Sequence, residues 1–261
     1  MHELDASRVE PYLQTQRYGR SLRALDVTGS TNDDARADAA SGAASGHVVL
    51  ADMQSSGRGS NGRAWSSPRG QDLFFSIVDR PAVSLPQLPP LTLAVGLGVA
   101  EAVESVVGTP GACQVKWPND VWLNGKKCAG ILVETSALGS TVESVVIGIG
   151  LNVNRLEFDE ELRDIATSLR ATSSERPPFD RPLVLAKVLF AVEHQVDRFV
   201  AEGPASIVQA LEPRLAMIGE RAVCGEIEGV VTGVSSSGAL LMRTERGVVE
   251  VHAGRLMPLP A

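Results

Sequence analysis

The sequence predicts an α/β (α+β) fold of alternating strands and helices, followed by a small β-barrel. Up to residue 212, apolar runs of strand length alternate with segments whose apolar residues recur at helical spacing. From residue 213 onward the expected strands are short and are separated by turns, which is typical of a small barrel. We therefore expect two domains, 1–212 and 213–261, and a chain of 261 residues is long enough for both.

The first 80 residues predict two helices and two strands. Residues 1–16 can form a short helix. The segment Ser30-Thr31-Asn32-Asp33 matches a capping box and predicts a helix that ends near Ser41. Apolar runs at 48–51 and 73–78 predict two strands. The polar side chains of the capping segment would lie at the positive end of their helix, where a small polar ligand is stabilised.

The remaining helices and strands are predicted from the same two signals, apolar residues at helical spacing and apolar runs of strand length. Helices are expected at 91–107, near 159–169, from the N-cap Asp180 to about Ala201, and after Pro204. Strands of the larger domain are expected at 113–117 and 142–154. Strands of the small barrel are expected at 222–223, 229–234, 239–243 and 248–252.

A basic, glycine-rich loop, residues 54–65, joins the two predicted strands. It reads Gln-Ser-Ser-Gly-Arg-Gly-Ser-Asn-Gly-Arg-Ala-Trp, and no acidic residue lies between Asp52 and Asp72. Glycine lets backbone N–H groups approach a ligand closely, and arginine offers a forked donor that suits phosphate or carboxylate. The loop therefore predicts an anion-binding site, with a merely flexible loop as the alternative.

Two nucleotide-binding motifs share the glycine spacing of this loop but fail in context. Gly57-x-Gly59-x-x-Gly62 has the dinucleotide-binding spacing, yet the residues after Gly62 lack the helical period which that motif requires. Gly57 and Gly62 also have the P-loop spacing, but Arg63-Ala64 stand where Lys-Ser/Thr is needed. Neither motif is adopted.

An Asn124-Gly125 turn predicts a β-hairpin formed by 121–123 and 126–134. The expected register pairs Leu123 with Lys126, Trp122 with Lys127, and Asp120 with Ala129. Alternation of side chains then places Asp120, Trp122, Lys127 and Ala129 on one face and Lys126 on the other. Asp120 and Lys127 could thus share a site, and an ordinary surface ion pair is the alternative.

Composition excludes several classes of protein. The net charge is −7 with no extended basic stripe, so we expect no DNA binding. The three cysteines and four histidines are dispersed, which argues against disulfides and against a His/Cys metal site and favours a reducing compartment. No signal peptide or membrane span is visible. We expect a cytoplasmic protein with no membrane partner.

Taken together, these segments resemble the biotin–protein ligases, which biotinylate the carrier domain of biotin-dependent carboxylases. The resemblance covers nearly the whole chain and implies a mixed sheet flanked by helices and an SH3-like C-terminal barrel, with 1–212 as the catalytic biotin/ATP-binding domain. The motifs that carry it occur in the family's order: Gly29-Ser30-Thr31-Asn32, the 54–65 loop, Lys116-Trp117-Pro118-Asn119-Asp120, Lys127-x-Ala129-Gly130-Ile131-Leu132-Val133-Glu134, Gly148-x-Gly150-x-Asn152 and Ala166-Thr167-Ser168-Leu169.

The resemblance implies a two-step reaction with ATP and biotin as substrates. The biotin carboxylate attacks the α-phosphate to give biotinyl-5′-adenylate, and a carrier lysine then takes the acyl group. Implied catalytic residues are Lys127, Asp120 and Arg58. Implied biotin-binding residues are Ser30, Thr31, Asn32, Gln54, Gly57, Arg58, Gly59, Ser60, Lys127, Gly130, Gly148 and Gly150. Implied ATP- or adenylate-binding residues are Arg63, Trp65, Lys116, Asn119, Asp120 and Asn152. Mg²⁺ would enter through the phosphates, with no fixed protein site.

The chain departs from the family at two points. Only about 29 residues precede Ser30, too few for the winged-helix repressor domain of some members. We therefore expect an enzyme without DNA-binding activity, either a monomer or a homodimer. Ser60 stands where family loops commonly have arginine, which removes one cation beside the acyl-phosphate. We expect the adenylate to escape more readily than in relatives with that arginine.

Two other functions compete with this one. A lipoate–protein ligase or octanoyltransferase would share the fold, but those proteins lack a Gly-Arg-Gly loop joined to Lys-Trp-Pro-Asn-Asp. A non-catalytic biotin- or nucleotide-binding regulator would not need Lys127 on the Asp120 face. Biotin-dependent ATP–pyrophosphate exchange separates the three.

Overall fold

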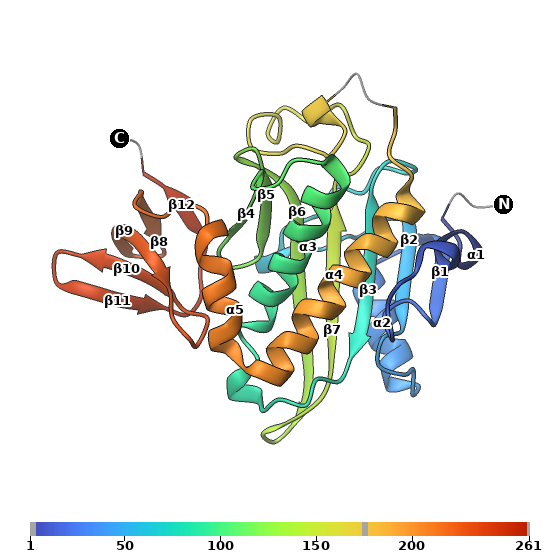
Figure 1. Ribbon diagram of the computed structural model, residues 1–261, viewed down its shortest axis with the longest axis horizontal. Coiled ribbons are helices and arrows are strands. Elements are labelled where there is room, and N and C mark those ends of the chain that lie inside the picture. Colours follow the sequence, from blue (N-terminus) through green and yellow to red (C-terminus); the bar gives the residue numbers. More distant parts are fainter. Residues whose placement is uncertain (1–3, 174–176, 260–261) are drawn as a thin grey trace.

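The computed structural model describes residues 4–173 and 177–259, which form two sheets and the helices packed on them (Figure 1). The larger sheet has seven strands in the order β1-β2-β3-β7-β6-β5-β4. Its only parallel pair is β1–β2, so the sheet is mixed, as the resemblance implied. The strands are β1 (Leu22–Thr28), β2 (Val48–Gln54), β3 (Leu73–Asp79), β4 (Cys113–Lys116), β5 (Asp120–Leu123), β6 (Lys126–Leu138) and β7 (Thr141–Leu151).

Helices cover both faces of this sheet. Along β2, Val48 and Leu50 face the main core, whereas Val49 faces a second apolar cluster that contains Ala35 of α2 (Thr31–Ala40). The main core includes the buried residues of α3 (Leu91–Val107) and α4 (Arg181–Glu202), which pack against each other. Helix α2 therefore lies on the opposite face, and its first turn reaches the site described below.

Three parts of the larger sheet's surroundings differ from the sequence expectation. Strand β1 was not expected, because only part of its length is apolar and its Asp26 and Val27 are exposed at the sheet edge. Of the expected helix at 1–16, the described part splits into α1 (Ala6–Val9) and η1 (Glu10–Tyr12); residues 1–3 lie outside the described residues. Residues 160–165 make turns, not the expected helix; the chain then forms an isolated bridge between Ala166 and Lys127, whose backbone N–H donates to Ile165 O (2.9 Å).

The smaller sheet follows α5 (Pro204–Leu211) and η5 (Glu212–Arg214). It has five antiparallel strands in the order β11-β10-β9-β8-β12, and the described residues show no ladder between its outer strands. This pairing does not establish a closed SH3-like barrel. The strands are β8 (Arg221–Cys224), β9 (Ile227–Val234), β10 (Leu240–Thr244), β11 (Gly247–Val251) and the unexpected β12 (Leu256–Pro258).

Candidate active site

A cavity of about 400 Å³ opens among the 54–65 loop, strands β5 to β7 and the smaller sheet. Small-molecule sites commonly have volumes of ~300–1,000 Å³. Gly57 alone of the predicted site residues does not line the cavity; a Cβ there would lie 2.9 Å from Trp65 O, so this glycine serves the packing of the loop. The predicted residues that do line it are Ser30, Thr31, Asn32, Gln54, Arg58, Gly59, Ser60, Arg63, Trp65, Lys116, Asn119, Asp120, Lys127, Gly130, Gly148, Gly150 and Asn152.

The β5–β6 hairpin contains a β-bulge that the expected register lacked. Trp122 pairs with Lys127 as expected, but Val121 pairs with Ala129 and Asp120 with Gly130. The expected Asp120–Ala129 pair is therefore wrong: Cys128 is the extra residue, and Ala129 turns into the core, where it is fully buried. Asp120 and Lys127 still lie on one face.

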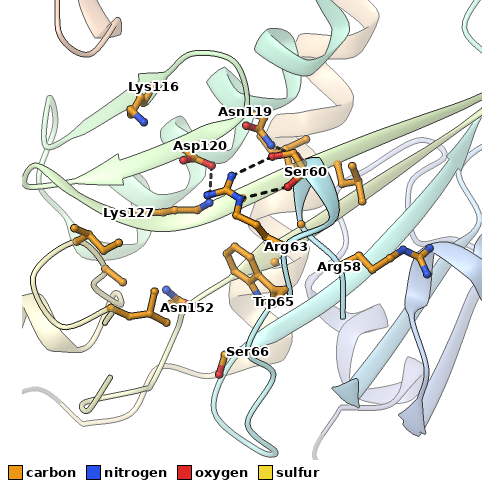
Figure 2. A pocket seen from close by; sticks show the side chains of 18 of the residues that line it. Arg58, Ser60, Arg63, Trp65, Ser66, Lys116, Asn119, Asp120, Lys127 and Asn152 are labelled. Carbon is orange, nitrogen blue, oxygen red and sulfur yellow. Dashed lines mark hydrogen bonds and ion pairs between the residues drawn. The ribbon is translucent and has the colours of Figure 1, made fainter. Parts of the chain in front are cut away.

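Lys127 is held from three sides. Its Nζ lies 2.6 Å from Asp120 Oδ1 and 5.1 Å from the centroid of the Trp65 ring. Its backbone N–H donates to Ile165 O, and its carbonyl accepts from the Thr167 N–H (2.8 Å). Figure 2 shows the ammonium group directed at Asp120. A fixed cation of this kind can stabilise negative charge that develops on a bound substrate.

The end of the cavity next to α2 carries oriented uncharged groups. Gln54 Oε1 accepts from the Thr31 backbone N–H (2.8 Å) and from Thr31 Oγ1 (3.1 Å). Asn32 donates through Nδ2 to Glu134 Oε2 and accepts at Oδ1 from Ser76 Oγ, both at 2.6 Å. The capping-box motif forms no side-chain cap, since the Ser30 hydroxyl makes no capping bond. That hydroxyl remains available to a ligand.

The predicted glycines of β6 and β7 make room for the protein's own side chains. A Cβ at Gly148 would lie 2.1 Å from Asn32 Oδ1. A Cβ at Gly150 or Gly130 would lie 2.5 or 2.7 Å from the Trp65 ring. The resemblance implied that glycine at these positions would allow close approach of the protein backbone to a ligand. In this structure, the missing side chains leave room for Asn32 to pack against Gly148 and for Trp65 to pack against Gly130 and Gly150.

The 54–65 loop is closed by its own backbone hydrogen bonds. Gly59 N–H donates to Arg63 O (2.7 Å), and Trp65 N–H donates to Gly57 O (2.8 Å). The Arg63 guanidinium donates to both oxygens of Ser60, at 3.4 and 3.3 Å. These contacts, drawn in Figure 2, hold the Arg63 guanidinium on the loop, where it lines the same cavity as Asp120 and Lys127.

Arg58 points away from that pair (Figure 2). Its guanidinium makes a bidentate ion pair with Asp33 of α2, at 2.6 and 2.7 Å. The Arg58 hydrogen bonds hold the pKa of Asp33 below its usual range. Arg58 thus anchors the loop to α2 while also lining the cavity.

Lys116 lies in a cationic part of the cavity. Its Nζ lies 5.4 Å from the centroid of the Trp122 ring. Burial lowers the pKa of Lys116; Asp120 opposes this, and the nearby positive charges of Lys127, Arg255 and Arg63 lower it further.

The amides of Asn119 and Asn152 are bound to backbone carbonyls, of Ile131 (2.7 Å) and Thr167 (2.9 Å). These two residues therefore fix the walls of this part of the cavity.

Several lining residues escaped the sequence reasoning. They come from the chain after β7, from the end of the loop and from the smaller sheet, and only tertiary packing brings them to the cavity. Arg155 directly follows the predicted strand 142–154, but its partner Asp72 (2.6 Å) is distant in sequence. The missed residues include Ser66, Arg155, Phe158, Leu162, Asp164, Ile165, Ala166, Gly254, Arg255, Leu256, Met257 and Pro258.

No metal site is evident at the cavity. Within 4–173 and 177–259, no group of three or more His, Cys, Asp or Glu side chains is placed to hold an ion. No described helix is long and apolar enough to cross a membrane.

The fold and this site define a protein with a cavity of small-molecule size built around a fixed lysine. Residues 24–152 match the biotin/lipoate A/B protein ligase family. The "Bifunctional ligase/repressor BirA" of Bacillus spizizenii is 35% identical over 257 residues, which cover 96% of this chain and 78% of that protein. The chain belongs to this family.

Two further relatives match over almost their whole length. The "Biotin--[acetyl-CoA-carboxylase] ligase" of Mycobacterium tuberculosis is 33% identical, over 92% of this chain and 91% of that protein. The biotin protein ligase of Aquifex aeolicus, solved in complex with biotin and ATP, superposes with a TM-score of 0.80 at 32% identity. That match covers 93% of this chain and 100% of the Aquifex chain.

Proposed function

We propose that the chain is an ATP-dependent biotin–[acetyl-CoA-carboxylase] ligase. The observation that carries the proposal is the Lys127 ammonium, fixed 2.6 Å from Asp120 inside a cavity of ligand size. The similarity to the Aquifex ligase, whose structure contains biotin and ATP, supports both substrates.

In the proposed first step, a carboxylate oxygen of biotin attacks the α-phosphorus of ATP. The bond from that phosphorus to the bridging oxygen breaks, and pyrophosphate leaves with the electron pair. Lys127 would sit between the carboxylate and the α-phosphate and stabilise the charge that develops there. In the second step the neutral ε-amine of a carrier lysine attacks the acyl carbon, loses its proton and displaces AMP.

The two ends of the cavity suit the two substrates. The polar groups of Ser30, Thr31, Asn32 and Gln54 would orient the head of biotin. Arg63, Trp65 and Lys116, within the walls fixed by Asn119 and Asn152, would surround the nucleotide. Phe158, Leu162 and Ile165 offer an apolar surface for its base. The cavity's acidic residues, Asp120 and Asp164, are too few for a metal cage, so Mg²⁺ would arrive on the phosphates.

The domain assignment and the wider context belong to the same proposal. Residues 1–212 would be the catalytic domain and 213–261 the C-terminal barrel. The acceptor would be a biotin carboxyl carrier domain, and the location the cytoplasm. Oligomeric state and the lack of DNA binding stay predictions from the sequence.

Biotin-dependent ATP–pyrophosphate exchange tests the proposal, with Lys126→Ala as the matched control for Lys127→Ala. We expect Lys127→Ala to lower exchange by about 10²–10³-fold, the usual cost of one transition-state donor. Lys126→Ala should be near wild type, because Lys126 Nζ donates to Arg163 O (3.1 Å) outside the cavity lining. Wild-type protein that binds biotin without exchange would be a regulator, and exchange driven by lipoate or octanoate instead of biotin would indicate the other acyltransferases. Normal exchange in Lys127→Ala would reject the mechanism.

A further inference from the structure

Glu134 of β6 does not line the cavity, but it touches a residue that does. It pairs with Val146 of β7, whose side chain lies in the apolar cluster with Ala35 of α2. Paired residues point to the same side of a sheet, so Glu134 faces α2. From that side its Oε2 accepts a hydrogen bond from Asn32 Nδ2 (2.6 Å), behind the uncharged end of the cavity.

Arg36 of α2 holds the Glu134 carboxylate in place. Its Nη2 lies 2.7 Å from Glu134 Oε1, and its Nη1 donates to Asp33 Oδ1 (3.0 Å). Asp33 is in turn held by its bidentate pair with Arg58. An ion-paired carboxylate offers acceptor atoms only. Glu134 therefore presents a fixed acceptor to the Asn32 amide.

This acceptor decides which way the Asn32 amide is turned. The amide nitrogen must face Glu134 Oε2, and it also lies 3.4 Å from the carbonyl oxygen of Leu132, which can only accept. The amide oxygen then faces Ser76 Oγ at 2.6 Å, and the Ser76 hydroxyl must donate to it.

The direction of this hydrogen bond passes on to Thr31. Ser76 is fully buried and has one hydroxyl proton, which it donates to Asn32 Oδ1. Thr31 Oγ1 lies 2.8 Å from Ser76 Oγ and 3.1 Å from Gln54 Oε1, and its own proton goes to one of these two oxygens. The side-chain oxygens of Thr31 and Asn32 thus offer lone pairs, and not protons, to a ligand in the cavity.

We propose that Glu134 is a positioning residue that fixes the direction of these hydrogen bonds, so that the site selects a ligand head with N–H donors. This inference rests on the proposed ligase function, because the ureido ring of biotin carries N–H groups. A head without donors leaves the lone pairs of the site unpaired, which costs free energy in a buried place. A neutral glutamine at 134 can also donate to the Asn32 oxygen, which would let the amide turn over and the direction reverse.

The test uses the full chain and measures biotin-dependent exchange and, separately, the Kd for biotin without ATP. The second ligand is the cyclic carbonate analogue of biotin, in which ring oxygens replace the ureido N–H groups. Wild type should prefer biotin, because the analogue sets lone pairs against lone pairs. Since a charge-assisted hydrogen bond becomes a neutral one, Glu134→Gln should raise the Kd and the KM for biotin by about tenfold. It should also reduce the preference for biotin over the carbonate, with kcat and the KM for ATP unchanged.

Glu143→Gln is the matched control, since Glu143 is an exposed residue of β7 outside the cavity. It removes the same charge and should leave every constant at the wild-type value. Arg36→Gln provides a second variant that leaves Glu134 itself intact, and the Arg36 side chain is exposed. By releasing the Glu134 carboxylate it should shift the preference in the same direction by a smaller factor.

Three outcomes would overturn the proposal. Equal constants in Glu134→Gln and Glu143→Gln would show that Glu134 does not act on the ligand. An equal loss of affinity for biotin and for the carbonate would make the role of Glu134 structural. A fall in kcat with an unchanged KM for biotin would place its effect on the chemical step, through Asp33 and Arg58. A wild type that binds biotin without exchange would instead refute the proposed function and leave the affinity measurements valid.

Discussion

Lys127 Nζ and Asp120 Oδ1 lie 2.6 Å apart across a hairpin whose register is shifted by one bulged residue. Because of the bulge, the residue opposite Asp120 is Gly130, which has no side chain. The Trp65 ring occupies the space above that glycine and lies under the Lys127 ammonium. The bulge thus allows the Asp120 carboxylate and the Trp65 indole both to lie next to the Lys127 ammonium.

The first prediction concerns the carboxylate of this group. Asp120→Asn removes the charge that holds Lys127, and a misplaced catalytic group costs about 10²-fold in rate. We expect the single-turnover rate of adenylate formation to fall by that order, with biotin affinity little changed. Asp164→Asn removes another carboxylate of the cavity that does not pair with Lys127, and it should have little effect. Equal rates in the two variants would mean that Asp120 does not position Lys127.

The glycines of β7 should give distinct kinetic defects. Gly148→Ala places a Cβ 2.1 Å from Asn32 Oδ1 and should displace the hydrogen bond from Ser76. Because a lost polar contact costs roughly a tenfold change in affinity, the KM for biotin should rise by about that factor. Gly150→Ala collides instead with the Trp65 ring and should lower kcat through Lys127. The same defect in both variants would contradict this division.

Ser60 should make the adenylate easier to lose. The serine side chain is uncharged, and both of its oxygens, the carbonyl and the hydroxyl, accept hydrogen bonds from Arg63. Ser60→Arg should slow the release of biotinyl-adenylate and reduce labelling of bystander proteins by about tenfold, as a new charge-assisted contact would. Ser56→Arg adds the same charge on an exposed part of the loop outside the cavity and serves as the control. Unchanged adenylate release in Ser60→Arg would refute the idea.

The activity should depend on the charge of Lys116. Its pKa is lowered, chiefly by burial, so it loses its proton at a lower pH than an ordinary lysine does. Only the protonated form attracts phosphate. We therefore expect kcat/KM for ATP, which reports the free enzyme, to fall as the pH rises through this lowered pKa. Lys116→Arg should remove the fall, since arginine stays charged. Lys187→Arg, on α4 outside the cavity, should keep it.

Local sequence signals predicted most of the helices and strands, and the family resemblance implied just under half of the residues that line the cavity. The apolar spacing predicted α3 with its observed bounds, and the Asn-Gly turn predicted the pairing of Trp122 with Lys127. The bulge at Cys128 could not be predicted, because Cys128 and Ala129 are both apolar and both are buried in the core, so the sequence pattern does not show where strict alternation breaks. Phe158 and Arg255 were missed for another reason. Their neighbours in the cavity are far away in the sequence, and neither stands in a motif.

The indole of Trp117 links the stability of the two sheets. Trp117 is 3% exposed, stands directly after Lys116, and holds Gly238 of the smaller sheet through its Nε1. Peeling the smaller sheet away would bring this ring into water and release the strand that carries Lys116. The two parts of the chain should therefore melt together, as one calorimetric transition. Because residues 254–258 of the smaller sheet line the cavity, the part of the site that they form should be lost in that same transition.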